Sequence, residues 1–142
     1  MAGTKIGNST VTDRTTGISA GSISAGAGLA GSAIDNSASG SDTMADFQLT
    51  FTLAATPVAG DPIYLYLLEN LGTIEDGSTS VQPQRVPDAI FNSRAVSTAQ
   101  VVSVQGVPLP PAAFTPLLWD GSLKAASSVT LLCKSYSRQS GS

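Results

Sequence analysis

Residues 107–111 constrain the fold of this chain more than any other stretch. The segment holds three prolines and no charged residue, and it lies between two apolar stretches, residues 99–104 and 113–119, that are typical of strands. Proline has no backbone N–H and holds φ near about −65°, so this segment cannot be an inner strand of a sheet. We therefore expect a stiff, extended crossing between two antiparallel strands, with the side chains of Val107 and Leu109 facing a partner.

Short apolar stretches recur along the rest of the chain. In residues 46–53, apolar and polar residues alternate with a period of two, which predicts a half-buried strand. Residues 63–68 are apolar on both faces, as in a central strand, and residues 89–96 and 129–136 are further candidates. About seven or eight short strands without a helical stretch predict an all-β fold, an antiparallel β-sandwich or jelly roll.

Residues 1–45 differ in composition from the rest. They are rich in Gly, Ser, Ala and Thr, lack aromatic residues, and carry large aliphatic side chains only singly. Burying those aliphatic side chains yields roughly 9–18 kcal/mol, whereas ordering the backbone costs on the order of 45–90 kcal/mol. We therefore expect a long extended N-terminal arm over residues 1–28, ordered only against neighbouring subunits, and a sandwich domain over residues 29–142. A flexible Gly/Ser linker is the alternative interpretation. The arm residues expected to contact a partner are Ile6, Val11, Ile18 and Ile23.

The residue types that most catalytic and metal sites need are scarce. The chain has no histidine and one cysteine, so a histidine base, an intramolecular disulfide and a Cys/His metal cluster are all excluded. Cys133 lies in an apolar run and is expected to be a small buried hydrophobe. No pair of carboxylates is singled out for glycosidase chemistry, and no phosphate-binding glycine motif is present. We predict no enzymatic activity, no catalytic residue, no metal and no cofactor.

The charge pattern limits the classes of partner that the chain is expected to bind. Charged residues make up 12% of the chain and the net charge is −3, without the basic stripe that nucleic-acid binding requires. No apolar run approaches the roughly 18 residues of a membrane helix, so neither nucleic acid nor a membrane is expected as a partner. Few surface charges mean little repulsion between copies, which favours self-association. Residues 1–20 lack the pattern of a secretion signal, so we expect the protein to be made in, and assembled from, a cytoplasm.

Trp119 has the greatest binding potential of any single residue. Exposed at a sheet edge beside Tyr64 or Tyr66, its ring would stack on a sugar. An Asp-Gly pair follows it directly, however, so we favour a ring that ends a strand and caps the core. Residues 69–84 form a long polar segment, of the kind that contacts a partner.

Two motifs carry a resemblance that covers about residues 47–120. Thr98-Ala99-Gln100 precedes the sequence GVPLPP of residues 106–111, with Phe114 behind it, and residues 55–67 read ATPVAGDPIYLYL. Both resemble motifs of the capsid decoration (cement) proteins of tailed bacteriophages. Residues 1–28 are not part of that pattern, so the role of the arm is inferred from its composition alone.

The resemblance implies a structural virion protein on the outer surface of a bacteriophage capsid. Such a protein cements neighbouring major capsid protein subunits, pairs with itself as a homodimer or other homo-oligomer, and is assembled in the host cytoplasm. Two alternatives stay open: a carbohydrate-binding or attachment module of a phage virion, which Trp119 would serve, and a structural component of a tail or fibre.

Overall fold

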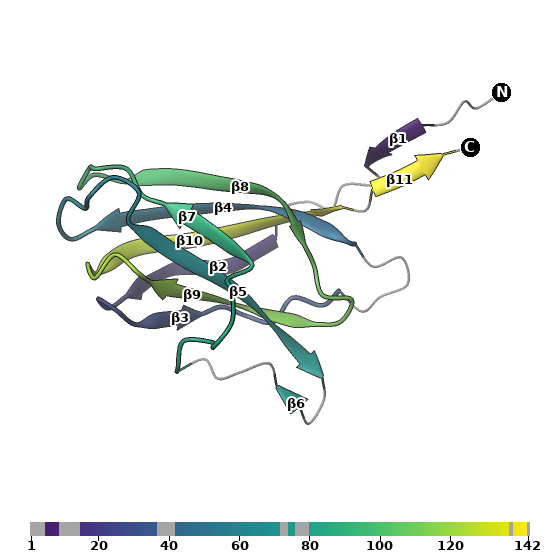
Figure 1. Cartoon of the computed structure of the whole chain (residues 1–142), viewed down its shortest axis with the longest axis horizontal. Helices are drawn as coiled ribbons and strands as arrows, with labels where there is room; N and C mark the ends of the chain where they lie inside the picture. Colours follow the sequence, from purple (N-terminus) through teal and green to yellow (C-terminus); the bar gives the residue numbers. More distant parts are fainter. Residues whose placement is uncertain are drawn as a thin grey trace.

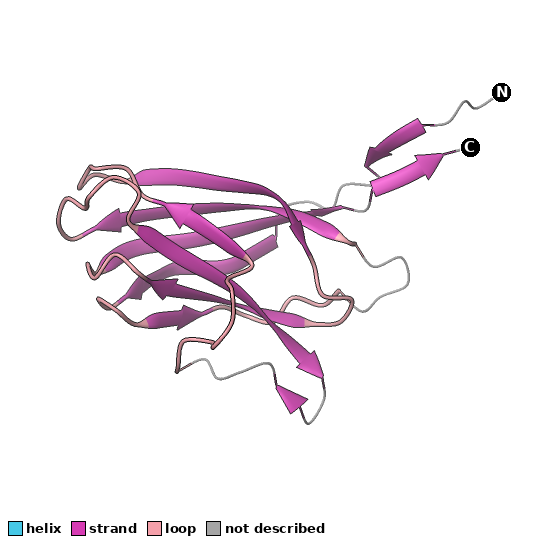
Figure 2. Cartoon of the chain, viewed as in Figure 1, coloured by secondary structure: helices cyan, strands magenta, loops and turns pink. Residues whose placement is uncertain are grey.

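The computed structural model describes residues 5–8, 15–36, 42–71, 74–75, 80–136 and 138–141. These residues form eleven β-strands and no helix (Figures 1 and 2). The strands are β1 (Lys5–Asn8), β2 (Thr15–Ile23), β3 (Gly28–Ala30), β4 (Met44–Leu53), β5 (Pro62–Leu71), β6 (Ile74–Glu75), β7 (Ala89–Asn92), β8 (Gln100–Pro108), β9 (Phe114–Asp120), β10 (Ala126–Tyr136) and β11 (Arg138–Gly141).

Two antiparallel sheets pack face to face. The first has the order β2-β10-β4-β8, and the second has the order β3-β9-β5, with β7 and β6 both pairing with β5. From β2 to β10, every connection crosses between the sheets except the passage from β5 to β7. This is the strand order of a jelly roll, so the all-β antiparallel fold expected from the sequence is confirmed.

The core lies between the two sheets and comes from one face of each strand. Burial alternates residue by residue along β4, as the period of two predicted. The residues buried in this core include Phe47, Leu49, Phe51, Leu65, Phe91, Phe114, Leu118 and Leu131. Cys133 belongs to the same core and is 2% exposed, so its assignment as a small buried hydrophobe is confirmed.

The prediction of an extended N-terminal arm is wrong from Thr15 onward. Residues 15–23 form β2, which pairs antiparallel with β10 at the edge of the first sheet. Ile18 and Ile23 are 5% and 1% exposed and pack in the core. The partner strand that this segment requires is therefore β10 of the same chain, which supplies the backbone hydrogen bonds that the entropy estimate left out. The boundary placed at residue 28 falls inside the sandwich.

The small residues of this region allow a close approach between the sheets. The carbonyl oxygen of Gly17 in β2 accepts a hydrogen bond of 3.0 Å from the backbone N–H of Ser32, just beyond β3. A β-carbon on Gly31 would collide with that same carbonyl oxygen, and one on Gly21 would lie 2.6 Å from Cδ2 of Leu29. The glycine-rich composition is thus a packing requirement where the chain passes from one sheet to the other.

The proline-rich crossing begins at an edge strand. β8 pairs only with β4 among the described strands and ends at Pro108, so the exclusion of an inner strand is confirmed. Val107, however, is 3% exposed and lies in the core, and Leu109 packs against it partly buried. The cause is an irregularity at Gly106, whose φ is 68° and where the β4–β8 register shifts. The extra residue reverses which face of the strand points inward, as β-bulges do.

Candidate functional site

The two outer faces of the sandwich differ in chemistry. On the first sheet a shallow depression is lined by Asp46, Phe47, Gln48, Ser103, Gln105, Leu132 and Lys134, which are mostly polar. The outer side of the second sheet carries a separate cluster of large apolar and aromatic side chains. This cluster, called the aromatic face from here on, consists of Tyr64, Tyr66, Leu68, Leu117 and Trp119. Tyr66, Leu68 and Leu117 are buried, so Tyr64 and Trp119, which are partly exposed, are the members of the cluster that form a candidate binding surface.

A row of side chains crosses the aromatic face at right angles to its strands. Tyr64 of β5 lies opposite Trp119 of β9. On either side, Tyr64 pairs with Ile90 of β7, and Trp119 pairs with Gly28 of β3. Ile90 is 43% exposed, while Tyr64 and Trp119 are partly buried. The register of four strands therefore places the side chains of Tyr64 and Trp119 at neighbouring positions on the same face of the sheet.

Each of these two rings lies over a glycine. A β-carbon on Gly28 would occupy the space of the six-membered ring of Trp119, and one on Gly121 would lie 2.6 Å from Cε2 of Tyr64. Both rings therefore rest against backbone, and both aromatic residues are partly exposed. The result is a low aromatic platform.

The position of Trp119 differs from the favoured expectation. Its ring does not cap the core between the sheets but packs on the outer cluster with Tyr66, Leu68 and Leu117. The residue alternation contains the signal, because Leu118 points into the core and its neighbour must point outward. The interpretation that places Trp119 beside Tyr64 at the surface fits this geometry.

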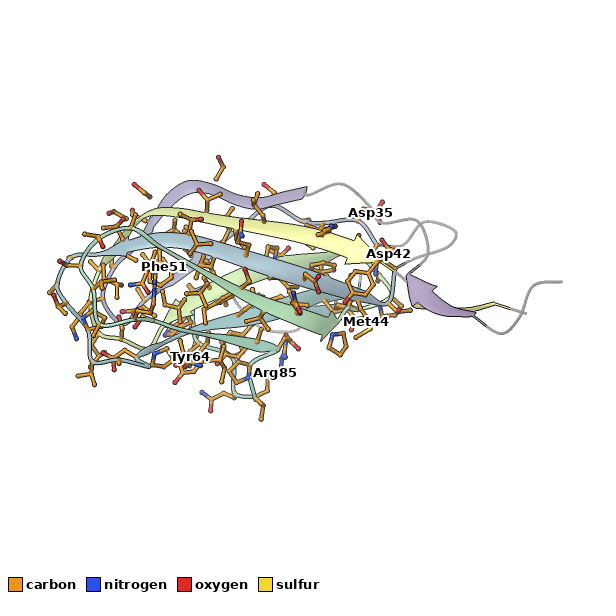
Figure 3. All side chains as sticks on the ribbon, turned by 90° about the horizontal axis from the view of Figure 1, so that it is seen from above. Asp35, Asp42, Met44, Phe51, Tyr64 and Arg85 are labelled. Atoms are coloured by element: carbon orange, nitrogen blue, oxygen red, sulfur yellow. The ribbon has the colours of Figure 1, made fainter. Side chains whose placement is uncertain are left out.

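The loop before β7 borders the aromatic face and completes the edge of β5. Beyond the residues that pair with β7, the backbone N–H of Leu67 donates to Oδ2 of Asp88 at 2.6 Å, and its carbonyl oxygen accepts from Nη2 of Arg85 at 3.1 Å. Arg85 also pairs with Asp88 at 3.0 Å and lies 5.6 Å from the ring centroid of Tyr66. Figure 3 shows Tyr64 and Arg85 on the same long side of the molecule. Sequence reasoning missed this arrangement, since nothing in the QPQRVPD segment signals it.

A second candidate site is the two-stranded ribbon of β1 and β11, called the β1–β11 ribbon. It is antiparallel, with Lys5 opposite Gly141 and Asn8 opposite Arg138. Figure 1 shows it extending beyond one end of the sandwich. Among the described residues no third strand pairs with it. A two-stranded ribbon is marginally stable in water, and its outer edges present unpaired backbone groups, so it is suited to strand addition.

The end of the sandwich that carries the ribbon is held by a polar network. Nδ2 of Asn36 donates to the carbonyl oxygens of Asp42 and Pro110 at 2.8 and 2.7 Å. Oγ of Ser135 donates to Oδ2 of Asp42 at 2.6 Å. Figure 3 shows Asp42 near this end. β10 ends at Tyr136 and β11 begins at Arg138, so this network lies at the end of the sandwich from which the ribbon extends.

The described residues offer little reactive chemistry. Burial raises the pKa of the Cys133 thiol to about 12, and the carboxylates of Asp42 and Asp46 add to the shift. A thiol held protonated in this way is inert as a nucleophile. In the described part of the chain, no three His, Cys, Asp or Glu residues are grouped to hold a metal ion. The same residues contain no helix long and apolar enough to cross a membrane.

The residues expected to contact partners are distributed over several environments. Ile18, Ile23 and Val107 are core residues whose side chains face inward, which contradicts a partner contact for them. Leu109 is partly buried against the core, and Trp119 is on the aromatic face. Ile6 lies in β1, opposite Ser140. Val11 lies outside the described residues.

Comparison with known proteins identifies no relative. No protein-family model, curated protein or solved structure matches the chain.

Proposed function

We propose that this protein is a structural virion protein that binds the outside of a tailed-bacteriophage capsid and cements neighbouring major capsid protein subunits. The observation that carries the proposal is the β1–β11 ribbon, which pairs only with itself among the described strands and extends beyond the sandwich. Its partners are the major capsid protein and further copies of this chain. It acts on the outer surface of the virion after assembly in the host cytoplasm.

The ribbon gives the protein a means of bridging subunits. Its two outer edges can each accept a strand, so that main-chain hydrogen bonds supply the contact without a large apolar interface. A sandwich held rigid at the base of the ribbon then sits on the shell while the ribbon reaches a neighbour. Many identical sites on one particle make weak contacts sufficient, because each bound copy raises the effective concentration for the next contact.

The remaining support comes from the sequence and the fold class. The motifs at residues 55–67 and 98–114 resemble those of capsid decoration proteins, and jelly rolls serve in viral capsid proteins. The fold alone does not assign this function, because the same architecture also carries lectins. A charge content of 12% favours close association between copies on a shell.

Two measurements test the proposal. Mass spectrometry of purified phage heads and tails is expected to find the chain in heads, and added protein is expected to co-sediment with undecorated capsids. Deleting residues 2–14 removes β1 and is expected to weaken co-sedimentation at least tenfold, while Val101→Ala on the edge strand β8 leaves it unchanged. A chain found in tails alone would assign a tail or fibre role instead. Undiminished binding of the deletion variant would contradict attachment through the ribbon.

A further inference from the structure

We propose that the aromatic face binds a neutral polysaccharide, with the rings of Tyr64 and Trp119 as its stacking platform. This inference does not depend on capsid binding. It concerns the long side of the sandwich, whereas the proposed capsid contact lies on the ribbon at one end (Figure 1).

The platform has the form that a sugar ring requires. Tyr64 and Trp119 are directly opposite on neighbouring antiparallel strands, which sets their β-carbons about 4.5–5.5 Å apart. Each ring rests over a glycine, Gly121 and Gly28 respectively, and both aromatic residues are partly exposed. A pyranose has one apolar face of C–H groups, which stacks against the face of an aromatic ring. Two rings in a row therefore suit successive sugar residues of one chain.

Hydrogen-bonding groups flank the platform on two sides. Gln82 donates from Nε2 to the hydroxyl of Tyr66 at 3.1 Å, and Arg85 and Asp88 lie along the same edge. On the other side, Asn92 is exposed and alternates with Ile90 on the outer side of β7. Aromatic rings bordered by the side-chain amides of Gln82 and Asn92 match a ligand that is apolar on its faces and hydroxylated at its rim.

The local charges favour an uncharged ligand. Arg85 lies over the ring of Tyr66, and it is already paired with Asp88 at 3.0 Å. An acidic polysaccharide would have to compete with that carboxylate for the guanidinium. A neutral glycan uses the rings without disturbing the pair.

The distribution of exposed aliphatic residues argues against a second protein as the occupant. A stable protein interface buries about 800 Å² on each partner around an apolar centre. Of the large apolar residues that are well exposed in the described chain, Ile90 is in the row beside Tyr64. The others lie in loops or on β8; they are Val58, Val81, Val86, Val101 and Leu123. Val81 and Val86 lie in the loop that borders the aromatic face, so the exposed aliphatic side chains near the platform lie at its margin and do not form an apolar centre.

The first test uses the intact protein, because Trp119 is its only tryptophan. Its fluorescence is titrated with dextran, laminarin, mannan and hydroxyethylcellulose, all neutral, with alginate as the acidic comparison. At least one neutral polysaccharide is expected to shift the emission and to reduce acrylamide quenching of Trp119 at least twofold. If none of the four changes the emission or the quenching, or if alginate alone does, the proposal is overturned.

The second test uses variants in affinity electrophoresis with the polysaccharide that gives the largest shift. Tyr64→Ala and Trp119→Ala are expected to weaken retardation at least tenfold, Trp119→Phe to retain most of it, and Val101→Ala to leave it unchanged. Circular dichroism checks that each variant is folded. If Trp119→Ala is not folded, Tyr64→Ala still tests the proposal. Retardation equal to wild type in Tyr64→Ala would overturn the proposal, as would a loss of self-association without any loss of retardation.

Discussion

Asp120 ends β9 with a carboxylate that is almost fully buried, at 2% exposure. Its Oδ2 accepts a hydrogen bond of 2.8 Å from the backbone N–H of Gly26. Its Oδ1 accepts from the backbone N–H and the hydroxyl of Ser122, at 2.8 and 2.6 Å. One side chain thus ties the β2–β3 turn to the turn after β9, at the end of the platform strands.

Asp120→Ala removes the acceptor and leaves those donors without it. We expect the free energy of unfolding to fall by about 2–3 kcal/mol, since each unsatisfied buried group costs about 1–3 kcal/mol. Asp120→Asn keeps one carbonyl oxygen and should lose less. Urea denaturation of the three proteins measures the difference. A loss for Asp120→Ala within about 0.5 kcal/mol, as for an ordinary surface substitution, would contradict this role.

Cys133 is expected to make the free energy of unfolding fall as the pH rises in the alkaline range. Its pKa is raised from 9.0 to about 12 by burial and by Asp42 and Asp46. Between these values the unfolded thiol ionises while the folded thiol keeps its proton. The contribution to stability is therefore full below pH 9.0 and is lost as pH rises toward about 12. Cys133→Ala should fall less steeply than wild type between about pH 8 and pH 10.5 in urea denaturation. Parallel slopes would show that the thiol is not held protonated.

At the level of single elements, the sequence predicts strands best where the polar–apolar alternation is intact. Residues 46–53 show this in β4, and the buried run of residues 63–68 is found within β5. β2 was missed because glycine and serine break its alternation and because its partner, β10, follows about a hundred residues later. The inward turn of Val107 was missed because a bulge changes the side-chain phase without a local signal.

Two truncations test whether β2 belongs to the sandwich while the residues before it do not contribute to stability. Deleting residues 2–14 leaves β2 complete, so the melting temperature should stay within a few degrees of wild type. Deleting residues 2–28 also removes Ile18 and Ile23 from the core, at about 1.5–3 kcal/mol each, and takes away a strand from the first sheet. That loss is comparable to the whole stability of a small domain, about 5–15 kcal/mol. A cooperative unfolding transition in the longer deletion would contradict the placement of β2.

Gly31 tests whether the two sheets need small residues where they meet. Gly31→Ala would place a methyl group against the backbone carbonyl of Gly17, which cannot move as a side chain can. We expect a loss of about 1–3 kcal/mol or more in the free energy of unfolding. Ser32→Ala, one residue further at an exposed position, is the matched control and should be neutral. Equal stability of the two variants would show that the strands are not in close contact.

At the scale of the whole molecule, the sequence predicted the fold class, but it predicted the candidate binding surfaces only in part. The sequence indicated Trp119 beside either Tyr64 or Tyr66, and only the register of β5 with β9 shows that Tyr64 is the residue opposite it. The β1–β11 ribbon pairs residues from opposite ends of the sequence, and neither segment has an apolar pattern that predicts a strand. Long-range pairing of this kind leaves little local pattern.

The molecule therefore presents two separate surfaces. One is the β1–β11 ribbon at one end of the sandwich (Figure 1), and the other is the aromatic platform on the outer side of the second sheet. Cementing through the ribbon requires that the ribbon end faces the shell, and polysaccharide binding requires that the platform remains accessible. This orientation follows from the position of the ribbon and differs from one in which the sandwich lies flat on its aromatic face.

Electron cryomicroscopy of intact phage particles tests the capsid assignment most directly. The expected result is density for the jelly roll on the outside of the shell, with the β1–β11 ribbon extended by a strand of a major capsid protein or of a neighbouring copy. Shells without this density, or a jelly roll whose ribbon points away into solvent, would contradict the assignment.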